Sequence, residues 1–126
     1  MNVAALQSFM AQEFAHAAVR HRLDEELGMH HGLSWQEFVL LDRLEAEGGV
    51  PEAQLAGALG VPRSQLLLRI RPLEKLGWIV RHTPDGAVRT QLSAAGRRLL
   101  GEARETAASA CAQLRLASRA AHPPPA

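Results

Sequence analysis

The stretch that decides the fold is Gln54-Leu55-Ala56-Gly57-Ala58-Leu59-Gly60-Val61-Pro62-Arg63-Ser64. Ala56, Gly60 and, a little further on, Leu66 have the spacing of a helix-turn-helix unit. Such a unit needs a small residue where the helices touch, a residue that tolerates positive φ in the turn, and an apolar anchor in the second helix. The spacing therefore predicts two short helices joined by a tight turn, the second of which starts near Arg63.

The residues that follow predict a β-hairpin and then a long helix. Gly77 is expected to end the second helix, and residues 78–82 and 88–92 have the character of two strands on either side of a Pro84-Asp85-Gly86 turn. Ser93 is suited to cap a last helix that runs to about residue 119. A hairpin directly after a helix-turn-helix unit is typical of winged-helix proteins, in which the hairpin is the wing.

Two more helices are predicted on the N-terminal side. Apolar residues at steps of three and four predict a long amphipathic helix over residues 3–27, with Gly28 expected to end it. They are Val3, Leu6, Met10, Phe14, Ala17, Leu23 and Leu27. Ser34 and Glu37 form a capping box for the next helix, and Pro51 is expected in the first turn of the one after that. The predicted class is mainly α-helical with a small β-hairpin wing.

With 126 residues, 47% of them hydrophobic and 21% charged, the chain is expected to form one domain over residues 1–119. The proline-rich residues 120–126 are expected to form a disordered tail. The start of the chain lacks the features of a signal peptide, and no run of apolar residues is long enough for a membrane span. These features, together with the single cysteine, predict a cytoplasmic protein. Cys111 is expected to be a buried structural thiol, because it falls on the apolar face of the last helix.

The net charge of +1 conceals a segregation of charge along the chain. Residues 1–60 hold nine acidic and three basic side chains, whereas residues 61–99 hold eight basic and two acidic ones. A basic segment in a protein that is otherwise nearly neutral is the pattern expected of a surface that binds phosphates. A basic face exposed to solvent without a partner is the alternative interpretation.

Four blocks of the sequence together resemble the multiple-antibiotic-resistance regulator (MarR) family. They are GLSWQEFVLL at 32–41, QLAGALGVPRS at 54–64, LEKLGWIV at 73–80 and LSAAGRRLL at 92–100. The resemblance implies a winged helix-turn-helix homodimer held together by its first and last helices, residues 1–27 and 93–119. It also implies a regulator, expected to be a ligand- or stress-responsive repressor, that binds a palindromic operator in double-stranded DNA with residues 54–76 in the major groove.

Matched by position, the resemblance places the recognition helix from Arg63 onward. Its DNA-facing side chains are expected to be Arg63, Ser64, Gln65, Leu67, Leu68 and Arg71, and its core side chains Leu66, Ile70 and Leu73. Leu67 and Leu68 stand where relatives carry polar residues, which predicts apolar readout of thymine methyl groups. Pro72 predicts a kink. The wing lacks the arginine of the family at its tip, so Arg81, His82 and Arg89 are the candidates for phosphate contacts.

The resemblance further suggests a pocket for a small-molecule effector of unknown identity near His30, His31 and Trp35. No cofactor or metal site is predicted, because His16 and His21 are five residues apart and do not share a helical face. No nucleophile–base pair or phosphate-binding loop indicates an enzyme. The alternative function is a winged-helix protein with degenerate DNA contacts that acts through protein–protein interaction, with Leu67 and Leu68 as a docking patch.

Overall fold

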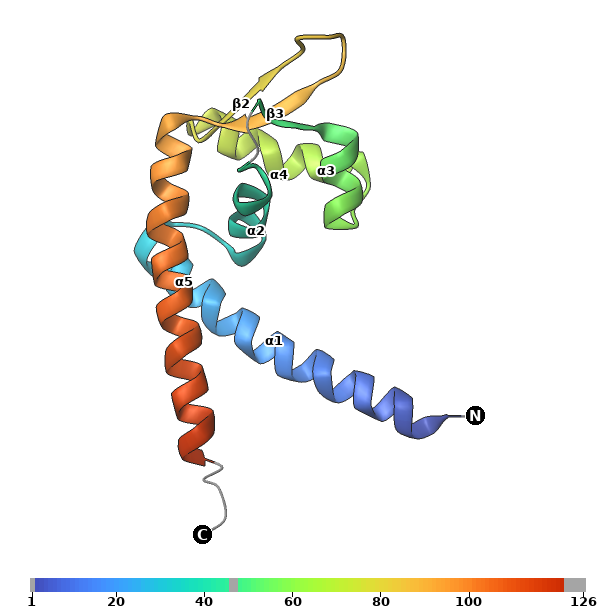
Figure 1. The fold of residues 1–126 in the computed structure, drawn as a ribbon, viewed down its shortest axis with the longest axis vertical. Coiled ribbons are helices and arrows are strands. Elements are labelled where there is room, and N and C mark those ends of the chain that lie inside the picture. The colour runs from blue at the N-terminus through green and yellow to red at the C-terminus, as the bar shows by residue number, and fades with distance from the viewer. Residues whose placement is uncertain (1, 46–47, 122–126) are drawn as a thin grey trace. The chain divides into compact units, whose positions relative to one another are not determined.

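The computed structural model describes residues 2–45 and 48–121, which form two compact units. Residues 36–103 make up one unit, and the segments before and after them, up to residue 35 and from residue 104, make up the other. The elements, which Figure 1 labels except for β1, are α1 (Val3–His31), α2 (Trp35–Arg43), β1 (Val50–Pro51), α3 (Glu52–Leu59), α4 (Arg63–Lys75), β2 (Ile79–His82), β3 (Arg89–Leu92) and α5 (Ala94–Ala121). This order confirms the predicted succession of helices and hairpin.

The sheet of the 36–103 unit has three antiparallel strands in the order β1-β3-β2. The predicted hairpin is present, with Ile79 opposite Leu92 and His82 opposite Arg89. The third strand, β1, was not predicted. Pro51 is the last residue of β1 and directly precedes α3. We expected it one position further on, within the first turn of that helix. An edge strand tolerates a proline, because its missing N–H leaves no ladder hydrogen bond open.

The core of this unit is built from α2, the helix-turn-helix, the inner side of the sheet and the start of α5. Its fully buried members include Leu40, Leu41, Leu44, Leu55, Leu66, Ile70, Leu73, Ile79 and Leu100. Gly60 has φ +67° in the turn, as its position in the sequence predicts. Helix α4 is assigned as one helix through Pro72 to Lys75, and the Leu76 N–H donates to the Pro72 carbonyl at 3.1 Å.

In the other unit, α1 is longer than predicted. It passes through Gly28 and ends at His31, where Gly32 with φ +67° is the C-cap. The N–H of Gly32 donates to the Gly28 carbonyl and that of Leu33 to the Leu27 carbonyl, which satisfies two carbonyls of the last turn. The prediction that Gly28 ends this helix is therefore wrong, because the left-handed cap lies four residues later.

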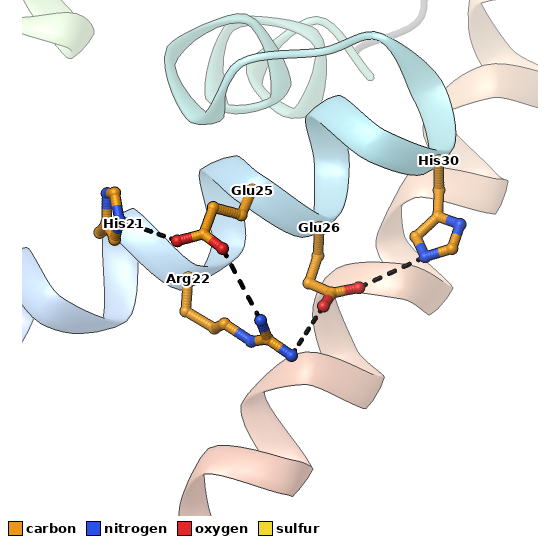
Figure 2. A network of polar contacts seen from close by, with 5 residues as sticks. All are labelled: His21, Arg22, Glu25, Glu26 and His30. Carbon is orange, nitrogen blue, oxygen red and sulfur yellow. Dashed lines mark ion pairs between the residues drawn. The ribbon is translucent and has the colours of Figure 1, made fainter.

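Arginine, glutamate and histidine side chains along α1 contact one another, as Figure 2 shows. Arg22 lies 2.8 Å from Glu26 and 3.8 Å from Glu25, while His21 lies 2.8 Å from Glu25 and His30 lies 3.3 Å from Glu26. Pairs of this kind, three or four residues apart on an exposed helix face, each stabilise a helix by a few tenths of a kcal/mol.

Within the described part of the chain, no group of three or more histidine, cysteine or acidic residues is placed to hold a metal ion.

The ends of α1 and α5 in this unit are largely uncovered. Residues 2–22 are exposed apart from the half-buried Ala17. On α5, Ala107 and Ala110 are buried but Cys111 is exposed. The prediction of a buried thiol is wrong, because α5 has little cover in this chain beyond Ala110 even though Cys111 continues its apolar face.

No helix among the described residues is both long and apolar enough to span a membrane. Helix α5 reaches Ala121. Residues 122–126, which make up most of the predicted disordered tail, lie outside the described residues.

Candidate nucleic-acid interface

Helix α4 has two opposite faces. Its inner face carries Leu66, Ile70 and Leu73, each with 0% exposure, which confirms the predicted core positions. Its outer face carries the exposed side chains Ser64, Leu68, Arg71 and Lys75, at steps of four, three and four residues. Because 3.6 residues make one turn, these four side chains form a straight stripe opposite the core. We call this set the outer stripe of α4.

The remaining predicted recognition residues lie beside this stripe. Gln65 is exposed on one flank, whereas Leu67 is half-buried on the other. Leu68 lies within the stripe and is 71% exposed. The two leucines are therefore not equivalent, and Leu68 is the one whose side chain is available to a partner.

A buried carboxylate holds two of the predicted DNA-binding arginines. Glu52, the first residue of α3, is 2% exposed. Its Oε1 accepts from Arg81 on β2 at 2.7 Å (Nε) and 2.6 Å (Nη2), and its Oε2 accepts from Arg63 Nη2 at 3.4 Å. The Arg63 side chain is 62% exposed and that of Arg81 26% exposed. The side chain of Arg81 is thus largely buried against Glu52, while that of Arg63 contacts Glu52 with one nitrogen and is mostly exposed.

The other two basic candidates of the wing are also engaged or partly covered. Arg89 donates from Nε to the Gly48 carbonyl at 3.2 Å and from Nη2 to the Gly49 carbonyl at 3.1 Å. His82 is half-buried, and its Nδ1 has no hydrogen-bond partner among the described residues. Phosphate contacts by the wing remain a prediction. The hydrogen bonds of Arg89 connect β3 to the residues directly before β1.

Two residues of this region were not singled out from the sequence. Lys75 completes the outer stripe, and its distance of eleven residues from Ser64 was the signal available. Glu52 gave no such signal, because its partners lie 11 and 29 residues away and a glutamate is seldom fully buried.

Comparisons with known proteins identify the fold through structure. No protein-family model and no curated protein matches the sequence. Among solved structures, the transcriptional regulator BldR of Sulfolobus solfataricus has a TM-score of 0.80 at 21% identity, over 88% of this chain and 81% of that one. A MarR family protein of Mycobacterium tuberculosis, in complex with salicylic acid, has a TM-score of 0.67 at 26% identity, over 82% and 78% of the two chains.

A third neighbour is a complex with DNA. The transcriptional repressor CouR of Rhodococcus jostii, bound to a 23-mer DNA duplex, has a TM-score of 0.73 at 23% identity, over 85% of this chain and 76% of its own. The chain has the winged-helix fold of the MarR family. The winged-helix fold that the four sequence blocks imply is thereby confirmed.

The three predicted effector residues do not come together in one cavity. His30 and His31 line one cavity of about 520 Å³, where the other lining residues are Glu26, Glu105, Thr106, Ser109, Ala110 and Gln113. His31 Nε2 lies 2.7 Å from the hydroxyl of Thr106. Trp35 lines a different cavity of about 420 Å³, together with Glu13, His16, Val19, Arg20, Leu23 and Cys111. The second cavity combines an indole and aliphatic side chains with two basic groups.

Proposed function

We propose that this protein is a MarR-type transcriptional repressor, without enzymatic activity, that binds palindromic operator DNA as a homodimer through α4. The observation that carries the proposal is the outer stripe of α4. It places a hydroxyl, an apolar side chain and two cations on a helix whose opposite face is fully buried. A helix of this kind fits the major groove, where cations meet phosphates or guanine and apolar groups meet thymine methyls.

Three further observations support the proposal. The side chain of Arg63, the first residue of α4, is 62% exposed. Residues 61–99 carry eight of the 14 lysine and arginine side chains of the chain. CouR, which shares the fold over 85% of this chain, has been solved with a DNA duplex bound. Sequence-independent affinity for DNA comes chiefly from such phosphate neutralisation.

The test is DNA binding by the full chain, with the operator obtained by selection from genomic fragments. We expect Arg71→Ala to weaken operator binding and to lower the slope of log affinity against log salt by about 1.8, the value for one lost phosphate contact in each of the two half-sites. Fluorescence anisotropy at several salt concentrations measures both quantities. Arg43→Ala, which removes an exposed arginine of the same unit from α2, is the matched control and is expected to leave the slope unchanged. The proposal fails if no fragment is bound above the non-specific background.

Leu68 predicts which feature of a base is read. We expect replacement of one thymine by deoxyuridine in each half-site, which removes only the 5-methyl group, to lower affinity about fourfold per half-site, since a buried methyl-sized group contributes about 0.8 kcal/mol. Leu68→Ala should abolish this discrimination, whereas Leu67→Ala, on the half-buried flank, should keep it. A thymine scan in which the wild type and Leu68→Ala respond alike at every position would contradict this assignment.

One observation favours the alternative function. Leu68, Pro72 and Leu76 are all exposed at steps of four residues, so one side of α4 presents an apolar ridge suited to a protein partner. The DNA selection separates the two functions. If the wild type binds no DNA fragment but captures a protein partner in a pull-down, and Leu68→Asp no longer captures that partner, the protein acts through protein–protein interaction.

For the effector, we propose the cavity beside Trp35. A ring stacked near Trp35, with its carboxylate toward Arg20 or His16 and away from the carboxylate of Glu13, is the chemistry that this lining suits. The solved complex of the M. tuberculosis MarR family protein with salicylic acid makes salicylate the first probe. If salicylate releases the operator in the same anisotropy titration, and Arg20→Ala prevents the release, the proposal is supported. If salicylate quenches no Trp35 fluorescence and leaves affinity unchanged, it is contradicted for this class of ligand.

A further inference from the structure

Glu52 is held from three directions at the junction of α3, α4 and the wing. Its backbone N–H donates to the Val88 carbonyl at 3.0 Å, and the residue before it is paired with Arg89 in the sheet. Its carboxylate receives Arg81 from β2 and Arg63 from α4. One side chain therefore connects the wing to the first residue of the helix that the proposed function places on DNA.

The two arginines are held unequally. Arg81 makes two contacts with Oε1, at 2.7 Å from Nε and 2.6 Å from Nη2, whereas Arg63 makes a single 3.4 Å contact with Oε2. A carboxylate with 2% exposure is costly to bury unless its charge is matched, and Arg81 meets that need. Arg63 is not required for neutralisation, and its side chain is 62% exposed.

The charges of this group give its net effect on DNA. One carboxylate between two guanidinium groups leaves a single positive charge, and the exposed member that can deliver it is Arg63. The remaining contact with Oε2 restricts where the Arg63 guanidinium lies before DNA arrives. Such restriction lowers the entropy lost on binding, which is how a pre-organised contact raises affinity for one geometry.

We infer that Glu52 is a positioning residue for DNA recognition: it neutralises Arg81 to fasten the wing, and it orients Arg63 toward one operator phosphate. This inference rests on the proposed function. It assigns the two arginines opposite roles, since Arg81 acts inside the unit and Arg63 acts on DNA. Glu52, the acidic residue in the first turn of α3, then contributes to the specificity of DNA binding.

The test is Glu52→Gln in the full chain, with affinity measured for the selected operator and for a scrambled duplex over a range of salt. Loss of the carboxylate adds one net positive charge, so we expect affinity for the scrambled duplex to rise. We expect operator affinity to fall, so that the ratio of the two drops about tenfold, the effect of losing one charge-assisted contact. A purely structural role would lower both affinities in parallel with the melting temperature, which circular dichroism measures.

A second variant keeps the inference falsifiable if Glu52→Gln does not fold. Glu52→Asp retains the charge but shortens the side chain by one methylene, so it should leave scrambled-duplex affinity unchanged and still weaken operator binding. Operator affinity equal to that of the wild type in Glu52→Asp, or parallel changes on both duplexes in Glu52→Gln, would overturn the inference. A wild-type chain that binds no operator at all would instead overturn the proposed function.

Discussion

Replacement of Gly96 by alanine is expected to destabilise the winged-helix unit by about 3 kcal/mol, the upper part of the range for overpacking a fixed site. A β-carbon at this position would overlap the carbonyl oxygen of Trp78 and lie 3.0 Å from its carbonyl carbon. Neither side can move easily. The Trp78 carbonyl accepts from the Ser93 N–H at 3.1 Å, and the Gly96 N–H donates to the Ser93 hydroxyl at 3.0 Å. Thermal unfolding followed by circular dichroism should show a fall in melting temperature of about 10 °C or more.

Gly101 is the matched control for Gly96. It lies on the same helix, α5, and a β-carbon there would meet nothing within 4 Å. Alanine in an open helical position stabilises by about 0.5–1 kcal/mol relative to glycine, so Gly101→Ala should raise the melting temperature slightly. Both variants are compared with the wild type at equal protein concentration, because an oligomer melts in a concentration-dependent way. Equal melting temperatures for the two variants would show that the Trp78–Gly96 approach is not a tight constraint.

The parts of the fold that the sequence predicts well are those set by local chemistry. Gly60 in the turn, the buried Leu66, Ile70 and Leu73 of α4, and the Pro84–Gly86 turn of the hairpin all follow from residue type and spacing over a few positions. The helix-turn-helix could be located because a positive φ and an apolar period are both written in adjacent residues.

The errors arise where distant residues or competing signals decide. Gly28 and Gly32 both suit a helix C-cap, and only the hydrogen bonds of Gly32 and Leu33 show which one is used. Strand β1 has two residues, too few for any alternation, and it exists through pairing with Thr90 and Arg89 some forty residues away. Local patterns carry no information on such pairing.

The candidate site divides in the same way. The outer stripe of α4 follows from helical spacing, so Ser64, Leu68 and Arg71 were predicted as exposed neighbours. The engagement of Arg81 by Glu52 and of Arg89 by the Gly48 and Gly49 carbonyls depends on the folded unit. The sequence shows that Arg81 and Arg89 are basic, but it does not show that both guanidinium groups have partners within the unit.

Helix α1 has an apolar stripe that no other part of the described chain covers. Its exposed apolar residues include Val3, Leu6, Met10 and Phe14, which recur at steps of three and four and so form one stripe along the helix. Phe14 is 68% exposed. A helix gains most of its stability by burying such a stripe, and residues 2–22 bury almost nothing here. The proposed homodimer supplies the missing cover, because a two-fold interface brings the same stripe from two chains together.

Phe14→Asp is accordingly expected to weaken dimerisation by about 10² to 10⁴-fold. Burial of one phenylalanine contributes about 1.5–3 kcal/mol, and the two-fold axis counts each substitution twice. Sedimentation equilibrium measures the change in dimer dissociation constant. Operator affinity should fall with it, since two recognition helices can span successive half-sites only when the chains are joined.

Met29→Asp is the control for this prediction. Met29 lies on the same helix and is 74% exposed, but it stands about a quarter of a turn away from the stripe, so its replacement should leave the dimer intact. The introduced charge and the loss of an apolar side chain are the same in both variants. If Phe14→Asp sediments as a dimer and binds the operator like the wild type, the α1 stripe does not form the interface. The paired α4 helices would then have to be held by another surface.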